Sequence, residues 1–175
     1  MRHVLVNAGP LMALGKLNRL HLLVDLYGTV HIPHAVYREV IVEGTAQGAP
    51  DAFLIRLFLE ARKLPVVEAS KEVLLGYLPP AILGAGETEL LALARDFQDV
   101  LVLLDDEEAR NEARRLGLPV KGTLGILIEA WRTGVLPFEE TEVLILEIAA
   151  RPDIWISERL CRQVLEQLAQ RATQG

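Results

Sequence analysis

The sequence predicts an α/β fold, a three-layer α/β/α sandwich with a mostly parallel central sheet, and a helical C-terminal appendage. Short apolar stretches of strand length alternate with segments whose apolar residues recur at helical spacing, which is typical of a parallel sheet covered by helices on both sides. Residues 100–104 form a continuous apolar run, as expected for a strand that is buried on both faces. Hydrophobic residues make up 51% of the chain and aromatic residues only 5%, so the core is expected to be aliphatic.

Length, charge and cysteine count limit the class of protein. The 175 residues fit one domain at 1–137 and a helical appendage at 138–175 that packs on the same domain. We expect no membrane span, because no apolar run approaches the roughly 20 residues that one needs, and no secretory signal. The single cysteine, Cys161, fits a reducing cytoplasm. The net charge of −6 argues against broad adhesion to nucleic acid, but it allows a nucleic-acid enzyme whose acidic site holds a metal ion.

Each predicted element rests on its apolar pattern and on the residues that bound it. In the first half we expect strands at 3–6, 29–32 and 65–67, helices through 11–17, 20–26, 34–42 and 51–63, and a loop at 43–50. Gly28 is expected to cap the second helix, Pro33 to end the second strand, and Asp51 to cap the helix that follows the loop. In the second half we expect a helix introduced by 84–89, a strand at 100–104, a helix from 105–108 to 114–117, a strand at 119–120, a helix at 123–133, and two amphipathic helices within 139–172 divided at 151–152.

Polar residues follow two of the predicted strands. Asn7 ends the first strand, and Asp105 and Asp106 end the strand at 100–104. Because ligands of open parallel sheets bind beyond the carboxyl ends of the strands, these residues are expected at one edge. Glu87, which enters a helix after two glycines, and Glu39, on the helix after the second strand, are expected to approach the same edge. Oxygen ligands without His or Cys favour Mg²⁺ or Mn²⁺ over zinc, so metal-assisted phosphodiester hydrolysis is the natural hypothesis.

Each of these residues also has a purely structural interpretation. The acidic run 105–108 and Glu87 suit helix N-termini, Glu39 suits a solvated helical charge pair, and Asn7 suits a turn. Their matching topological places favour a shared site. A phospho-acceptor domain of the receiver kind is disfavoured, because Asn7 and two small residues stand where an acidic pair is needed. The basic residues nearest the site suit either RNA phosphates or helix C-termini: Arg110, Arg114, Arg115 and Lys121.

Five blocks of the chain, in order, resemble the DUF3368 branch of PIN-domain proteins, which is related to VapC toxins. The resemblance extends over about residues 3–134, and the tail is similar to the helical end of that family. The blocks are VNAGPLMALGKLNRLHLL at 6–23, IPHAVYREV at 32–40, GAGETE at 84–89, LLDDEEAR at 103–110 and GTLGIL at 122–127.

The resemblance implies an α/β/α sandwich that binds Mg²⁺ or Mn²⁺ through an acidic cluster and cleaves single-stranded RNA. The residues it implies are catalytic Glu39, Glu87 and Asp105, and metal ligands Asn7, Glu39, Glu87 and Asp105, with Asp106 as an accessory. Two positions depart from the pattern. Asn7 stands where Asp is general, which removes one negative charge, and Gly9 stands where Ser is usual, which removes a hydroxyl.

The leading hypothesis is a metal-dependent endoribonuclease, the toxin component of a toxin–antitoxin system, that acts on single-stranded RNA (tRNA, rRNA or mRNA) in the cytoplasm. Its expected partners are a small antitoxin protein and a second copy of the chain, because leucine- and isoleucine-rich helices leave apolar surface to share. The alternative is a catalytically weakened PIN fold that acts as a protein- or RNA-binding module. The charge that is missing at Asn7 motivates this alternative.

Overall fold

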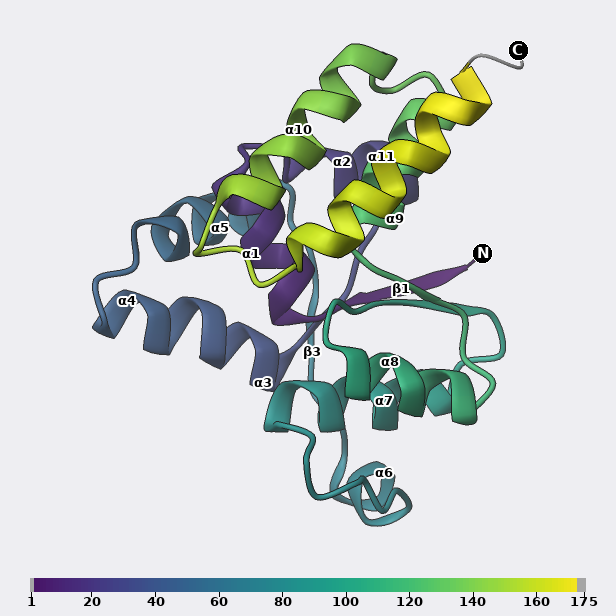
Figure 1. Ribbon diagram of the computed structural model, residues 1–175. Helices are drawn as coiled ribbons and strands as arrows, with labels where there is room; N and C mark the ends of the chain where they lie inside the picture. Colours follow the sequence, from purple (N-terminus) through teal and green to yellow (C-terminus); the bar gives the residue numbers. More distant parts are fainter. Residues whose placement is uncertain (1, 173–175) are drawn as a thin grey trace. The chain divides into compact units, whose positions relative to one another are not determined.

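Five short parallel strands form the centre of the first of two compact units in the computed structural model, which describes residues 2–172 (Figure 1). The first unit extends to Thr123, and the second begins at Leu124. A parallel bridge between Leu5 and His31 joins a three-stranded sheet to a two-stranded one. The pairs are β1 (His3–Val6) with β4 (Val100–Leu103), β4 with β5 (Val120–Lys121), and β2 (Ile32–Pro33) with β3 (Val66–Val67).

The order of the strands reverses between β1 and β4. From β1 the chain adds β2 and β3 on one side, and it later adds β4 and β5 on the other side. All four residues of β4 are buried, which confirms the prediction of a strand covered on both faces. Val6 is in register with Leu103, so the carboxyl ends of β1 and β4 lie side by side. This reversal is the place where ligands of open α/β sheets bind.

The helices of the first unit cover both faces of the sheet, which confirms the α/β/α prediction. Leu90, Leu91, Ala109 and Ala113 of two of these helices share one core cluster with Leu5 of β1. Figure 1 shows α7 and α8 on one side of β1, with α1 and α5 on the other. The helical elements are α1 (Ala8–Lys16), α2 (His21–Tyr27), α3 (His34–Tyr37), the π-helical η1 (Arg38–Glu43), α4 (Gly44–Ala46), α5 (Pro50–Ala61), α6 (Lys71–Leu75), α7 (Ala85–Arg95) and α8 (Glu107–Arg115).

The predicted loop at 43–50 is partly wrong, because the helical run that begins with α3 continues through η1 and α4. Gly44 does not end it: its backbone is right-handed, and a Cβ there would lie 3.1 Å from the Cβ of Ala52, so the glycine permits close packing on α5. The run ends before Gly48, whose φ is +74°. The cap prediction for Asp51 is also wrong, since Ala49 is the N-cap of α5 and Asp51 lies in the first turn. The short helix α6, capped by the Ser70 hydroxyl, was not predicted.

The second unit contains the remainder of α9 (Thr123–Arg132), together with α10 (Phe138–Ala150) and α11 (Glu158–Ala172), which contact each other. The predicted division of the tail at 151–152 is confirmed, and Arg151 there pairs with Glu147 and Asp153. Cys161 is buried. The packing of 138–175 on the preceding domain stays a prediction. Within the described residues, no helix has both the length and the apolar character that a membrane crossing needs.

Helix α7 is fixed in place by the buried carboxylate of Glu89. The residue is only 7% exposed, and its two oxygens accept hydrogen bonds from the backbone N–H groups of Ala35, at 2.6 Å, and Ala69, at 2.9 Å. Ala35 belongs to α3, and Ala69 follows β3. One side chain therefore joins three segments that are distant in sequence, and bonds of this kind to a charged acceptor are among the strong ones.

Replacing Glu89 with Gln tests this connection. Glutamine keeps one acceptor but presents an NH₂ group to the other backbone N–H, so we expect the free energy of unfolding to fall by about 2 kcal/mol. Urea denaturation measures the change. Glu68→Gln, at an exposed position, is the matched control. Equal stability of Glu89→Gln and the control would contradict a role for Glu89 in fixing α7.

Candidate metal centre

Asn7 places an amide group at the carboxyl end of β1. Its backbone N–H donates to the carbonyl of Leu103 at 3.0 Å, which continues the β1–β4 ladder by one residue. Asn7 is the N-cap of α1, but its side chain makes no capping hydrogen bond. Its Nδ2 instead donates to Oε1 of Glu87 at 3.2 Å, while its buried Oδ1 has no partner. A buried oxygen without a protein partner is costly, and an amide oxygen beside two carboxylates is a donor that suits a hard cation.

Glu87 has a structural partner in addition to Asn7. It is the third residue of α7, and its Oε2 accepts the backbone N–H of Gly84 at 2.7 Å. This is half of a capping box, since Gly84 has no side chain to complete the other half. The helix-start interpretation of Glu87 is therefore correct in part, yet Oε1 still turns toward Asn7.

Glu39 approaches the same place from η1, and Gly86 leaves room for it. A Cβ on Gly86 would lie 3.2 Å from both Oδ1 of Asn7 and Oε2 of Glu39. The two oxygens thus flank one small hollow that any larger residue at position 86 would fill. The π-helical turn positions Glu39, and single π turns are frequent at functional sites.

The charge of this cluster is not balanced by a neighbouring cation. Glu39 is exposed as a residue, but its carboxylate lies against Gly86, and this partial burial, together with the charges of Glu87 and then Glu43, raises its pKa. Neither Glu39 nor Glu87 pairs with a lysine or arginine of the described chain. Two carboxylates beside an unpaired amide oxygen form a donor set that suits a hard divalent cation.

Asp105 lies after the end of β4, on the other side of the strand-order reversal from Asn7. Its Oδ1 accepts the backbone N–H of Thr123 at 2.7 Å, and its Oδ2 accepts the Thr123 hydroxyl at 2.6 Å. Burial raises the pKa of Asp105, while the Thr123 hydrogen bonds and the positive charge of Arg110 oppose that increase. The carboxylate also lies close to α1, because a Cβ on Gly9 would be 3.4 Å from Oδ2.

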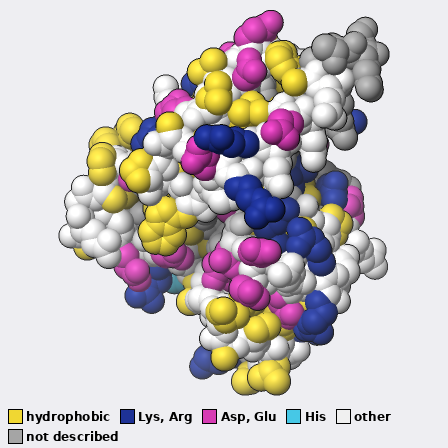
Figure 2. All heavy atoms as spheres, viewed as in Figure 1, with side chains coloured by type: hydrophobic (Ala, Val, Ile, Leu, Met, Phe, Trp, Pro, Cys, Tyr) yellow, Lys and Arg dark blue, Asp and Glu magenta, His cyan; other side chains and the backbone are white. Residues whose placement is uncertain are grey.

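Asp106, the predicted accessory ligand, caps a helix, and its role toward a metal ion stays a prediction. Its Oδ1 accepts the backbone N–H of Ala109 at 2.8 Å and caps α8, and the side chain is exposed. The structure thus separates two adjacent acids, one at the strand end and one in a helix cap. Exposed acidic and basic side chains then lie side by side over α8 (Figure 2).

The structure brings Asn7, Glu39 and Glu87 together, while Asp105 follows the neighbouring strand β4 and lies against Thr123 and Gly9. In the part of the chain that is described, no three His, Cys, Asp or Glu side chains gather closely enough to hold a metal ion. The donor set that fits a cation therefore consists of two carboxylates and a neutral oxygen, and the ligand roles of all four residues stay predictions. The sequence interpretation missed Thr123, although it lies two residues after β5 just as Asp105 lies two residues after β4.

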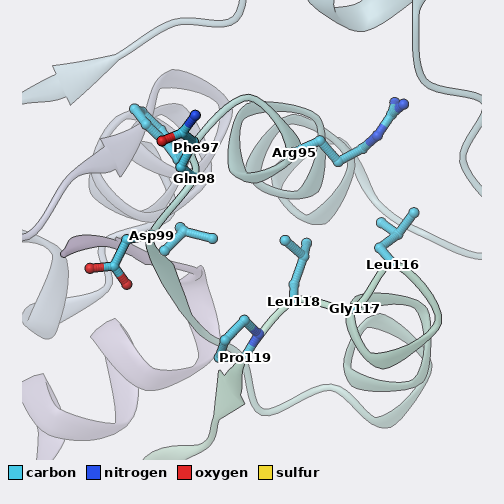
Figure 3. A pocket seen from close by; sticks show the side chains of 9 residues that line it. Arg95, Phe97, Gln98, Asp99, Leu116, Gly117, Leu118 and Pro119 are labelled. Carbon is cyan, nitrogen blue, oxygen red and sulfur yellow. The ribbon is translucent and has the colours of Figure 1, made fainter.

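A separate cleft of about 450 Å³ opens at the other end of the strands, where β4 begins (Figure 3). Its two charged side chains already have partners. Arg95 donates to the carbonyl of Gly76 at 2.8 Å and points away from the cleft, and Asp99 pairs with Arg2 at 3.6 Å. The cleft lies at the amino ends of the strands, so it is not part of the candidate metal centre.

Fold and site together define an α/β protein with carboxylate and amide oxygens at the reversal point of a parallel sheet. The chain belongs to the DUF3368 family of PIN domains, whose model matches residues 3–170. It is also similar to a PilT N-terminus domain protein from the hyperthermophilic archaeon Sulfolobus solfataricus P2, with 16% identity, a TM-score of 0.49, and coverage of 73% of this chain and 92% of that one. No curated protein matches the chain. Membership confirms the predicted resemblance and gives the protein a nuclease-type fold that is generally metal-dependent.

Replacing Asn7 with Asp tests the effect of the uncharged side chain at this position on stability and on metal binding. The change removes the N–H donor to Glu87 and adds a like charge beside Glu39, so we expect a lower unfolding midpoint in EDTA. With Mn²⁺ present, the added carboxylate should tighten binding about tenfold, or about 1.4 kcal/mol, by calorimetry. Asn18→Asp, at an exposed site, controls for net charge. An Asn7→Asp protein that is more stable in EDTA and binds Mn²⁺ no better would refute this account.

The raised pKa of Glu39 gives stability a pH dependence of known sign. The folded state holds this proton more tightly than the unfolded state, whose pKa is near 4.5, so stability falls as pH rises from 4.5 through the folded-state pKa. Glu39→Gln should remove that fall and, in EDTA at neutral pH, raise the unfolding midpoint by an amount equivalent to less than about 1 kcal/mol, since the residue is exposed. Thermal unfolding at several pH values measures the midpoint of wild type and variant, with Glu68→Gln as control. A variant less stable than wild type at neutral pH is the contrary outcome.

Proposed function

We propose that the protein is a metal-dependent endoribonuclease of the VapC-like toxin type, which hydrolyses phosphodiester bonds of single-stranded RNA. The observation that carries the proposal is the hollow at Gly86, where the unpaired Asn7 Oδ1 and the Glu39 carboxylate face one point and Glu87 bonds to Asn7. Membership of the PIN-domain family supports nuclease chemistry at this place.

Asn7, Glu39 and Glu87 would hold a Mg²⁺ or Mn²⁺ ion, with Asp105 completing the site. When bound, such an ion activates a water molecule and stabilises the charge that develops on a phosphoryl group. Asn7 contributes an oxygen without a charge and fixes Glu87 through its N–H.

Basic residues on α8 and near β5 support a nucleic-acid substrate. Arg110 is half-buried beside Asp105, where burial and the charge of Arg114 lower its pKa, and Arg114 is exposed one turn further on. Arg115 is a poorer candidate, because Glu112 binds its guanidinium through bonds of 2.6 and 2.7 Å. Arg110 and Arg114 are therefore the residues we assign to the backbone phosphates of RNA.

A binding module that has lost catalysis is the second candidate. The donation of the Asn7 N–H to Glu87 favours it, because this bond stabilises the centre without a metal ion. Exposed apolar side chains support a protein partner, whether a small antitoxin or a second copy of the chain. They lie on α5, as Phe53, Leu54 and Leu57, and around α6, as Leu75, Leu78 and Ile82.

Cleavage of labelled RNA separates the two candidates. The protein should cut a single-stranded oligoribonucleotide in Mn²⁺, cut the matched duplex poorly, and lose cleavage in EDTA. Glu87→Gln and Asp105→Asn should each reduce the rate at least about a hundredfold, as removal of groups that stabilise the transition state does. Glu68→Gln, purified in parallel, should keep the full rate and exclude a contaminating nuclease. Cleavage that survives Asp105→Asn would refute the assignment, and RNA binding without cleavage by wild type would favour the module.

A further inference from the structure

Thr123 is a fully buried polar residue, and every hydrogen bond of its backbone amide and hydroxyl goes to one carboxylate. Its relative exposure is 0%, and it donates to both oxygens of Asp105. The position follows from β5, where the carbonyl of Lys121 accepts the backbone N–H of Leu104 at 2.9 Å and sets the two strand ends side by side. A hydroxyl group buried in this way has a structural or functional partner, and here that partner is a candidate site residue.

Gly122 provides the clearance for this arrangement. A Cβ at position 122 would lie 2.8 Å from Oδ1 of Asp105 and 2.4 Å from Nη1 of Arg110, which is too close for either contact. A side chain at this position would displace the Asp105 carboxylate or the Arg110 guanidinium from its place. The Gly-Thr pair after β5 therefore forms a cradle that is specific for the Asp105 side chain.

The cradle leaves Asp105 able to bind a cation. An ionised carboxylate has about four lone-pair sites, and Thr123 uses one on each oxygen. The remaining lone pairs are free, and the rotation of the carboxylate is fixed. Groups that orient a metal ligand in this way typically change metal affinity by 10- to 100-fold when they are removed.

We propose that Thr123 is a positioning residue that orients the Asp105 carboxylate for the divalent cation through its hydroxyl group. This inference rests on the proposed function only through the metal centre. It concerns affinity for the ion, so it can be tested whether or not RNA is cleaved.

Gly9 offers a second place from which a hydroxyl can reach the same oxygen. A Cβ there would lie 3.4 Å from Oδ2 and 3.2 Å from the Cβ of Asp105, so a serine fits if Asp105 shifts by a few tenths of an ångström. Gly9 lies within α1 and has no positive φ, so its backbone accepts a serine without strain. Gly9→Ser is therefore a designed rescue for the loss of the Thr123 hydroxyl.

Mn²⁺ binding by calorimetry tests the inference on four proteins. Thr123→Val keeps the shape and the backbone N–H but removes the hydroxyl, and it should weaken binding at least about tenfold. Thr123→Ser should stay within about threefold of wild type. Gly9→Ser combined with Thr123→Val should recover most of the loss. Unfolding midpoints in EDTA establish that each protein is folded, and the rescue distinguishes positioning from a general structural defect.

The outcomes separate this inference from the proposed function. A folded Thr123→Val protein that binds Mn²⁺ like wild type, or a Thr123→Ser protein as weak as Thr123→Val, would overturn the positioning role alone. Binding that depends on the hydroxyl, in a wild-type protein that cleaves no RNA, would support the role and overturn the ribonuclease. No Mn²⁺ binding by wild type would overturn both.

Discussion

The candidate centre depends on one buried carboxylate that does not belong to it. Glu89 accepts backbone N–H groups from α3 and from the segment after β3, and so it ties α7 to two parts of the chain that the sheet alone would leave loosely connected. Glu87 lies two residues earlier on α7, and Glu39 lies on the helical run that α3 begins. Two strong hydrogen bonds offset the burial of the Glu89 charge. The approach of two like charges at Gly86 is therefore imposed by the scaffold.

Asn7 reduces the electrostatic cost of that approach. A third carboxylate at the end of β1 would repel Glu39 and Glu87 in the absence of a cation, whereas the amide donates a hydrogen bond to Glu87 and leaves only its own Oδ1 unpaired. Two costs remain without a cation: the pKa of Glu39 is raised, and one buried oxygen lacks a partner. Compared with a carboxylate, the amide would attract a metal ion less strongly, but it makes the protein more stable when no metal ion is bound.

Most of the fold but only part of the candidate centre could be predicted from the sequence. There are physical reasons why the rest of the centre could not. The apolar run of β4 and the polar residues that end β1 and β4 are local signals, so the sheet edge with Asn7 and Asp105 was predictable. Glu39 reaches Gly86 from a π-helical turn, which helical periodicity does not reveal. Asp105 and Asp106 are adjacent and chemically alike, so only the positions of Thr123 and Ala109 decide which one caps a helix.

The carboxylates of Glu87 and Asp105 have separate hydrogen-bond partners, and this bears on how a cation would bind. Glu87 is held by Asn7 and by the N–H of Gly84, and Asp105 is held by Thr123. None of these bonds uses all the lone pairs of the carboxylate concerned, so a cation would add to the existing network and would not have to break it. The shape of the centre is then the same for an enzyme and for a binding module. The choice between the two would then depend on how strongly the centre attracts a cation, which the uncharged amide of Asn7 at the end of β1 would weaken relative to a carboxylate.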